Sequence, residues 1–140
     1  MGSIRFLVAL SLGLVGLAAC GDTDSDSKEG VVDVTLEDFK ITLSESSAPV
    51  GEVTFALDNK GPSAHEFVVF QTDLAPDDLP TGSTGDVAES EEFAPVDEVE
   101  DIEVGASPKL TVDLAAGKYV VICNIPAHYR QGMHAAFTVG

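Results

Sequence analysis

Fold and chemistry are both decided by the stretch Lys118-Tyr-Val-Val-Ile-Cys123-Asn-Ile-Pro-Ala-His128-Tyr-Arg-Gln-Gly-Met133. It begins with a β-branched run that is typical of a buried strand. A thiol, an imidazole and a thioether then follow in one loop, at Cys123, His128 and Met133. Soft sulfur ligands with imidazole, and one weak axial thioether, are the donors of a blue-copper electron-transfer site. The stretch therefore predicts a strand that ends in a thiolate and a loop that wraps a metal ion.

A copper site of this type needs a second imidazole, and His65 is the candidate. It follows a turn-rich segment, 59–64, and opens an apolar strand. Two strand ends at one pole of a β-sandwich bring such a histidine beside the sulfur-bearing loop. Within that loop, Pro126 fixes its own φ, and Gly132 permits a tight bend before the methionine.

Short segments with a period of two recur through the rest of the chain, separated by Gly, Pro, Asn and Asp. This pattern predicts an all-β sandwich, and the 110 residues from 31 to 140 are enough for one core. The expected strands carry alternating apolar side chains at Val32, Val34 and Leu36, at Phe39, Ile41 and Leu43, at Val53, Phe55 and Leu57, and at Leu110, Val112 and Leu114; denser apolar runs cover 65–71, 118–123 and 135–139.

One segment, 73–98, departs from this rhythm. It contains Pro76, Pro80 and Pro95, several glycines and many carboxylates, and it is too long and polar for a hairpin loop. We expect a long acidic insertion that is either mobile or a lobe with a short helix, folded over the sandwich. Its carboxylates lack the ordered spacing of a calcium loop, so a solvated acidic face is the preferred interpretation. A role in partner docking is a further hypothesis for the same face.

The N-terminus predicts export and lipid attachment. One positive charge, Arg5, precedes an apolar stretch of about 13 residues, shorter than the roughly 20 that span a bilayer. It ends in Leu17-Ala18-Ala19-Cys20, which resembles the bacterial lipobox, where the leader is cut before a cysteine that receives a lipid. We expect a signal peptide at 1–19, a lipidated Cys20 with a flexible tether over 20–30, and a place on the cell membrane facing the periplasm or the exterior. An uncleaved membrane anchor and an ordinary secretory signal are the alternatives.

Charge and cysteine content narrow the function classes. The chain carries a formal charge of −17, and loss of the leader leaves six basic against 24 acidic side chains, or −18. Such a charge argues against nucleic acid and anionic lipid as partners and favours a solvated exterior or a basic protein partner. With Cys20 lipidated, Cys123 is the one remaining thiol of an exported chain, which metal ligation explains. A Cys20–Cys123 disulfide and a buried structural thiol are the alternatives.

The pattern Cys-x4-His-x4-Met after an apolar strand, with a histidine upstream, resembles the cupredoxins, which are Greek-key β-sandwich proteins with type 1 blue copper. The spacing from Cys to His is similar to that of azurin, rusticyanin, auracyanin and sulfocyanin. The resemblance covers 31–140 and implies one copper ion that cycles between Cu(I) and Cu(II). It implies the ligand set His65 and His128 through Nδ1, Cys123 through its thiolate, and Met133 axially.

One position departs from the family pattern. Many cupredoxins have Asn or Ser after the first histidine ligand, whereas this chain has Glu66. Glu66 points away on its strand, braces the ligand loop or ligates the metal. Asn124, Ser63 and Asn59 are the other candidates for bracing. Because a buried ionised Glu66 would stabilise Cu(II), the family's reduction potential does not carry over to this chain.

These features predict a membrane-anchored, extracytoplasmic electron carrier, a monomer that serves redox partners such as a cytochrome, an oxidase or a reductase. The resemblance places electron exit at the edge of His128, within an apolar patch. His134 would face away on its strand and is not expected to ligate. Copper delivery or storage is the alternative function, but it favours a Met-rich site, and the only methionines are Met1 and Met133. The sequence has no Ser-His-Asp arrangement, phosphate loop or zinc-hydrolase motif, so we do not expect an enzyme.

Overall fold

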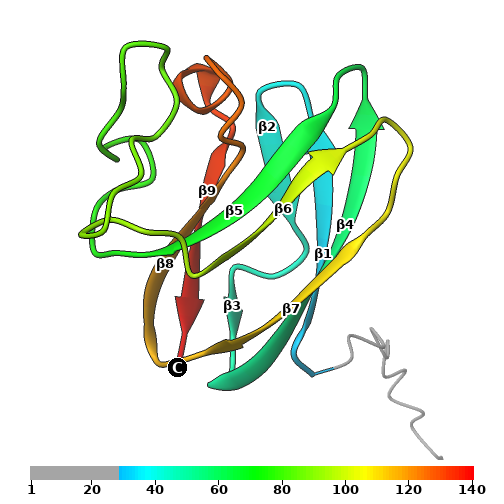
Figure 1. Ribbon diagram of the computed structural model, residues 1–140. Helices are drawn as coiled ribbons and strands as arrows, with labels where there is room; N and C mark the ends of the chain where they lie inside the picture. The colour runs from blue at the N-terminus through cyan, green and yellow to red at the C-terminus, as the bar shows by residue number, and fades with distance from the viewer. Residues whose placement is uncertain (1–28) are drawn as a thin grey trace, which may run out of the picture.

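The computed structural model describes residues 29–140, which form a sandwich of two β-sheets (Figure 1). The four-stranded sheet has the order β2-β1-β4-β7, with β1 at Val31–Glu37, β2 at Lys40–Leu43, β4 at Gly51–Gly61 and β7 at Lys109–Leu114. The five-stranded sheet has the order β3-β9-β8-β5-β6, with β3 at Ser47–Ala48, β5 at His65–Gln71, β6 at Asp97–Ile102, β8 at Gly117–Ile122 and β9 at His134–Val139. A 3-10 helix, η1 at Tyr129–Gln131, lies between β8 and β9.

Both sheets are mixed. β1 runs parallel to β4, and β3 runs parallel to β9, while the other pairs are antiparallel. The chain crosses repeatedly from one sheet to the other, for example from β4 to β5 and from β7 to β8. The predicted all-β, Greek-key β-sandwich is therefore confirmed. The predicted signal peptide, Cys20 and most of the tether lie outside the described residues.

The core forms where the apolar side of each sheet faces the other. Val53, Phe55 and Leu57 alternate with more exposed neighbours along β4, as a strand with one buried face requires. The ring of Phe55 lies 5.2 Å from that of Phe67 and 5.3 Å from that of Phe137, so the two sheets interlock at this point. Burial of one such side chain contributes about 1.5–3 kcal/mol, which holds the strand ends above it in fixed positions.

The dense apolar runs of β5 and β8 bury both of their faces. Phe67 and Val69 enter the sandwich core, whereas Val68 and Phe70 point to the opposite side of the sheet and are buried there as well. Residues 73–96 of the acidic insertion cover that side, beside η1 (Figure 1). A strand covered on both faces has no polar alternation, which explains the sequence pattern.

The insertion is an irregular lobe folded over the five-stranded sheet. Leu79 and Val87 bury their side chains in the apolar cluster on that sheet, and the ring of Phe93 stacks on Phe70 at 4.8 Å. Its one regular feature is an isolated bridge between Thr81 and Val87. The predicted lobe is therefore present, but residues 73–96 contain no short helix.

Three local expectations were wrong or incomplete. β6 was not predicted, because its sequence Asp-Glu-Val-Glu-Asp-Ile is rich in carboxylates, which are uncommon in strands. It forms nonetheless because it is an edge strand of its sheet, where charged side chains are tolerated. The last two residues of the predicted insertion, 97 and 98, belong to this strand. β3 has only two residues and carries no pattern. Phe39, expected on a strand, lies in the β1–β2 turn with a φ of 63° and a 39% exposed side chain.

Among residues 29–140, the structure has no helix with the length and apolar character needed to cross a membrane.

Candidate metal centre

Three donor side chains converge at one end of the sandwich. His65 opens β5, Cys123 follows β8, and His128 lies just before η1. Sγ of Cys123 lies 3.8 Å from Nδ1 of His65 and 3.6 Å from Nδ1 of His128. The donor atoms of all three side chains lie within 4.8 Å of one another. The structure therefore brings together three predicted ligands from two separate parts of the chain.

The spacing of these atoms fits a shared metal ion. Sulfur and imidazole ligands sit about 2.0–2.3 Å from such an ion, so two of them lie about 3.5–4 Å apart. Both measured sulfur-to-nitrogen distances fall in that range. His65 and Cys123 are fully buried and His128 is half-buried, so the site is closed to bulk water except at one ring. A thiolate with two imidazoles in a closed site is the donor chemistry that copper favours.

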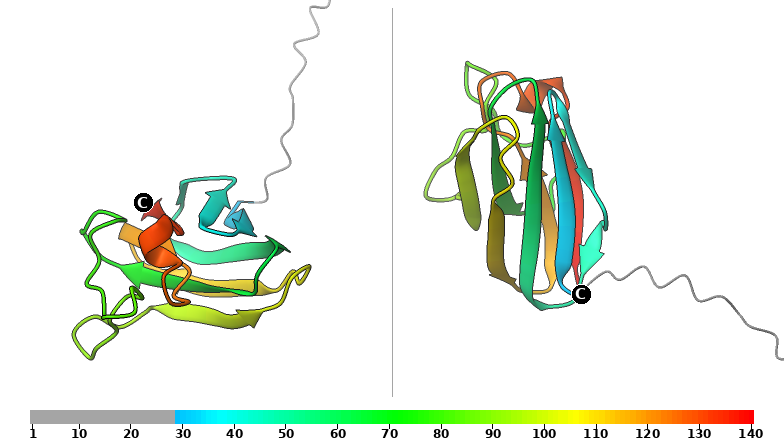
Figure 2. Two further views of the ribbon diagram at one scale, coloured as in Figure 1. Left: turned by 90° about the horizontal axis from the view of Figure 1, so that it is seen from above. Right: turned by 90° about the vertical axis from the view of Figure 1, so that its right-hand side faces the viewer.

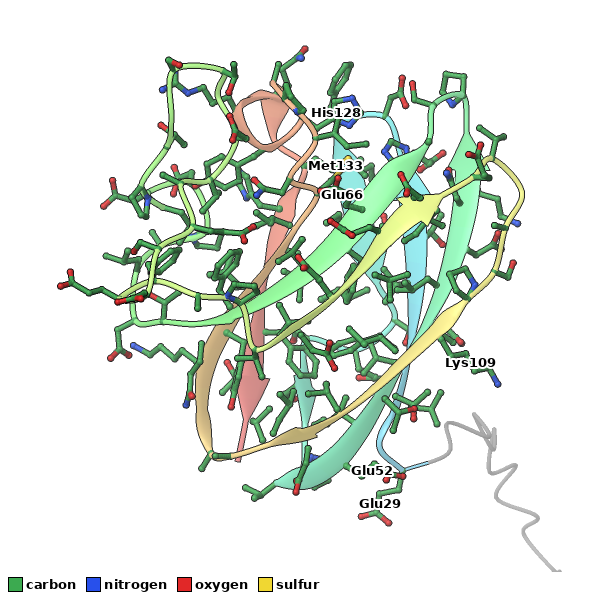
Figure 3. The ribbon with its side chains drawn as sticks, viewed as in Figure 1. Glu29, Glu52, Glu66, Lys109, His128 and Met133 are labelled. Atoms are coloured by element: carbon green, nitrogen blue, oxygen red, sulfur yellow. The ribbon has the colours of Figure 1, made fainter. Side chains whose placement is uncertain are left out.

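Met133 closes the loop that carries the other donors. Its side chain is fully buried at the same end of the sandwich as His128 (Figure 3). The backbone N–H of Cys123 donates to the Met133 carbonyl at 3.0 Å, and the Met133 N–H donates to the His128 carbonyl at 3.1 Å. Gly132, with a φ of 106°, makes the bend that the sequence predicted at this position. The four predicted ligand residues thus form one site.

Burial dominates the electrostatics of the site. It raises the pKa of the Cys123 thiol, an effect opposed by backbone N–H groups of Glu66 and Ile125 that face the sulfur. Burial also lowers the pKa of His65, assisted by the neighbouring His128 and opposed by the carboxylate of Asp38. The thiol is therefore protonated and the imidazole neutral when no metal is bound. A cation that enters displaces the thiol proton and becomes the dominant local charge.

Glu66 contacts the site through its backbone. Its N–H lies 3.4 Å from Sγ of Cys123, the position from which it stabilises a thiolate. Its half-buried side chain does not belong to the donor group and shares its surroundings with carboxylates of β6. Burial raises the pKa of Glu66, and the charges of Glu100, Glu98, Asp101 and Glu89 raise it further.

Asn124, a predicted bracing residue, connects the ligand loop to the acidic insertion. Its Oδ1 accepts from the Val87 N–H at 2.6 Å, and its Nδ2 donates to the Val87 carbonyl at 3.3 Å and to Glu89 at 2.9 Å. Tyr129 makes a second connection, because its hydroxyl accepts from the Leu79 N–H and donates to the Pro76 carbonyl. The insertion is therefore hydrogen-bonded to both ends of the segment that carries His128.

Asn59, also a predicted bracing residue, holds the loop that precedes His65. It is fully buried, and its Nδ2 donates to the carbonyls of Ser63 and Ile102 at 2.9 and 2.8 Å. Its Oδ1 accepts from the Gly61 N–H at 2.7 Å. This one side chain ties β4, the loop and the end of β6 together, and so fixes the start of β5.

Sequence reasoning missed two residues of the site, Asp38 and Phe39. Both lie in the β1–β2 turn of the four-stranded sheet, and nothing in the local pattern points to them. The Asp38 carboxylate lies 3.4 Å from Nε2 of His65, and the Phe39 ring packs edge-on against His128 with centroids 5.3 Å apart. His134, by contrast, opens β9 with its ring against Tyr129 and is not in the donor group.

Comparison with known proteins supports the family suggested by the ligand loop. A family model described as a cupredoxin-like domain matches residues 7–139. No curated protein sequence matches the chain. Among solved structures, reduced auracyanin from Roseiflexus castenholzii has a TM-score of 0.60 at 20% identity, over 80% of this chain and 98% of that chain. A structure of rusticyanin variants has a TM-score of 0.56 at 15% identity, over 81% of this chain and 79% of that chain.

A multi-copper oxidase from Pediococcus acidilactici also matches, with a TM-score of 0.50 at 15% identity, over 97% of this chain but only 31% of the oxidase. At these identities the likeness to solved structures shows the fold. Membership of the family is shown by the cupredoxin-like family model, which matches nearly the whole chain. Cupredoxins bind one type 1 copper, and the donor set gathered here is of that kind. The chain therefore belongs to the cupredoxin-like domain family.

Proposed function

We propose that this protein is a one-electron carrier with a single type 1 copper ion, tethered outside the cytoplasm by a lipid on Cys20. The observation that carries the proposal is the cluster of one thiol and two imidazole nitrogens within 4.8 Å, in which His65 from β5 meets Cys123 and His128 from the loop closed by Met133. Bound there, copper supplies reversible Cu(I)/Cu(II) chemistry. Its partners are redox proteins that donate and accept single electrons.

Each of the four side chains has a distinct role in this proposal. Cys123 binds as a thiolate and supplies covalency, while His65 and His128 bind through Nδ1 and tolerate both oxidation states. Met133 would supply the fourth donor, a weak thioether that favours the reduced state. Because the loop is cross-linked by backbone hydrogen bonds to Cys123 and His128, its geometry changes little when an electron moves.

Electrons leave through the ring of His128. This is the one imidazole of the pair that is only half-buried, since His65 has no exposed surface. The Phe39 ring packs against His128, and the three residues just before it in the loop, Ile125, Pro126 and Ala127, are apolar and at least partly exposed. A small apolar rim around an exposed ligand edge suits brief contacts with a partner, because it sheds water without forming a permanent complex.

The same geometry favours a carrier over an enzyme. His65 and Cys123 are inaccessible, and four protein donors leave no position for a substrate. Among residues 29–140, no second group of histidine, cysteine or carboxylate side chains is assembled to hold another metal ion. Substrate oxidation at this centre is therefore not part of the proposed function.

The lipid anchor rests on the sequence of residues 1–30 alone. The short apolar leader, the small residues before Cys20 and the polar tether support it. In this arrangement the tether keeps the sandwich near the membrane while leaving it free to turn toward its partners. Mass spectrometry of the mature N-terminus tests this part of the proposal, and an unmodified or internal Cys20 would contradict it.

A copper titration tests the metal and the redox role. Cu(II) added to the purified protein is expected to give intense thiolate-to-copper absorption in the visible region and a narrow parallel hyperfine splitting in the EPR spectrum. Cys123→Ser is expected to abolish both signals, because the covalent sulfur donor is lost. His134→Ala is the matched control, since that ring lies outside the donor group, and it should leave both signals in place. A Cys123→Ser protein with the parent spectrum would refute the assignment.

Copper delivery or storage is separated from electron transfer by retention of the ion. A carrier keeps its copper through repeated oxidation and reduction in the presence of a competing chelator, because the buried ligands do not open. A delivery protein loses the ion to the chelator once it is reduced. Reversible voltammetry with unchanged copper content supports the carrier, and loss of copper on reduction supports delivery.

A further inference from the structure

We propose that Asp38 is a positioning residue for the metal centre, which accepts a hydrogen bond from Nε2 of His65 and thereby fixes the tautomer and the orientation of that ligand. The proposal rests on the function proposed above, because it assumes that His65 binds copper through Nδ1. It assigns a role to a carboxylate on the four-stranded sheet, whereas the ligand itself is on the five-stranded sheet.

The two groups face each other inside the protein. Oδ1 of Asp38 lies 3.4 Å from Nε2 of His65, a side chain with no exposed surface. Both atoms are buried, and within residues 29–140 neither makes a hydrogen bond; the 3.4 Å approach leaves each facing the other with its hydrogen-bonding capacity unused. Two buried polar atoms that face only each other are complementary if one carries a proton and the other accepts it.

Metal binding through Nδ1 decides which atom carries the proton. Nδ1 of His65 points toward Sγ of Cys123 at 3.8 Å, on the side of the donor cluster. A neutral imidazole that offers the lone pair of Nδ1 must carry its proton on Nε2. Left without an acceptor, that buried N–H would be costly, and Asp38 is the acceptor that the structure places there. Carboxylates that orient metal-bound histidines in this way also raise the basicity of the ring.

The carboxylate is itself held in place. Oδ2 of Asp38 accepts from Oγ of Ser63 at 3.1 Å, and the carbonyl of Ser63 accepts from Nδ2 of Asn59 at 2.9 Å. This chain of contacts leaves Oδ1 aimed at His65. The next residue in the turn, Phe39, packs against His128, so a single turn contacts both imidazoles of the centre.

A fixed carboxylate also tunes the centre through its charge. Its negative charge on one side of the His65 ring favours the more positive oxidation state of copper, and therefore lowers the reduction potential. An amide at the same position keeps a hydrogen-bond acceptor but removes the charge. Substitutions at Asp38 can therefore separate its effect on the orientation of the His65 ring from the effect of its negative charge.

Asp38→Asn and Asp38→Ala, in the full chain purified in detergent, test the role. Asp38→Asn is expected to keep the copper and the narrow EPR splitting of the parent, with a midpoint potential shifted to more positive values. Asp38→Ala is expected to shift the potential in the same direction, to alter the splitting and to weaken copper binding about tenfold or more. Glu52→Gln, which removes one carboxylate at the opposite end of the sandwich (Figure 3), is the control and should change none of these.

A metal-free measurement keeps this test separate from the test of the copper site. Imidazole 15N NMR of the apo protein is expected to show His65 as the Nε2–H tautomer, and to show this state weakened in Asp38→Ala but kept in Asp38→Asn. An Nδ1–H tautomer in the parent would overturn the proposal, as would parent-like potentials in both Asp38 variants. A parent protein that forms no blue centre refutes the proposed function instead, whatever the NMR shows.

Discussion

At the scale of single residues, the site depends on donors that are fixed before any metal arrives. Backbone N–H groups face Sγ of Cys123, and Met133 is buried and tied by its backbone to Cys123 and His128. Such a site does not need to reorganise to bind or to change oxidation state. The identity of each side chain, rather than its mobility, therefore sets the properties of the metal.

Met133→Leu is expected to retain copper and to raise its reduction potential. The exchange conserves volume, so it costs less than about 1.5 kcal/mol of stability. It removes the weak axial sulfur while leaving the thiolate and both imidazoles in place. Voltammetry and copper analysis of the variant check this expectation. Complete loss of copper would show that Met133 is needed to hold the ion.

At the scale of elements, β6 and the acidic insertion place unusual charge around one side of the centre. Burial raises the pKa of Glu98, and the neighbouring charges of Glu89, Glu100 and Asp97 raise it further. Glu66 lies among the same carboxylates. This group of like charges destabilises the folded state at neutral pH, although the lobe is anchored by Asn124 and by apolar packing.

Glu98→Gln is expected to be more stable than the parent at pH 7. Glu98 has a folded-state pKa above its ordinary value of 4.5, so the folded protein binds its proton more tightly than the unfolded chain. The destabilisation is present above the raised pKa and disappears as the pH falls below 4.5. Denaturant unfolding of both proteins across this range measures the difference. Asp113→Asn, on the exposed side of β7, is the control, and an advantage independent of pH would contradict the explanation.

Much of this arrangement could be predicted from the sequence, because its signals are local. The alternation of Val53, Phe55 and Leu57 predicted a strand, and the spacing from Cys123 to Met133 predicted the donor set. β6 lacked such a signal because its many carboxylates leave no alternation of apolar and polar residues to indicate a strand. Asp38 and Phe39 meet the imidazoles only through packing of one sheet on the other, a contact that no spacing along the chain records.

At the scale of the whole molecule, the chain carries a net charge of −17, whereas the residues just before His128 in the loop, Ile125, Pro126 and Ala127, are uncharged. Seen from above, the loop that contains His128 closes one end of the sandwich, with the insertion on one side (Figure 2). In the function proposed above, a partner that docks at this end meets uncharged loop residues on a strongly acidic protein. Fields of this kind govern the rate of encounter more than the affinity.

The rate of electron transfer is expected to change with salt concentration in opposite directions for positively and negatively charged partners. The rate with a basic cytochrome should fall as ionic strength rises toward 0.1 M, where the screening length is about 10 Å. The rate with ferricyanide, an anion, should rise over the same range. Stopped-flow measurements at constant pH check both slopes. Rates that are independent of salt for both reactants would show that the acidic surface does not act on encounter.

The ligand loop between β8 and β9 has a consequence for engineering. Three of the four proposed copper ligands lie within one short segment, so the metal site could in principle be altered by exchanging that segment for one from another protein. Yet Asn124 and Tyr129, from that same segment, hold the acidic lobe against the sheet. Replacing the segment with a shorter one from another protein would therefore remove these hydrogen bonds and leave the lobe held by its apolar packing alone. In this protein, a change to the length of the ligand loop therefore also changes how the acidic lobe is attached to the sheet.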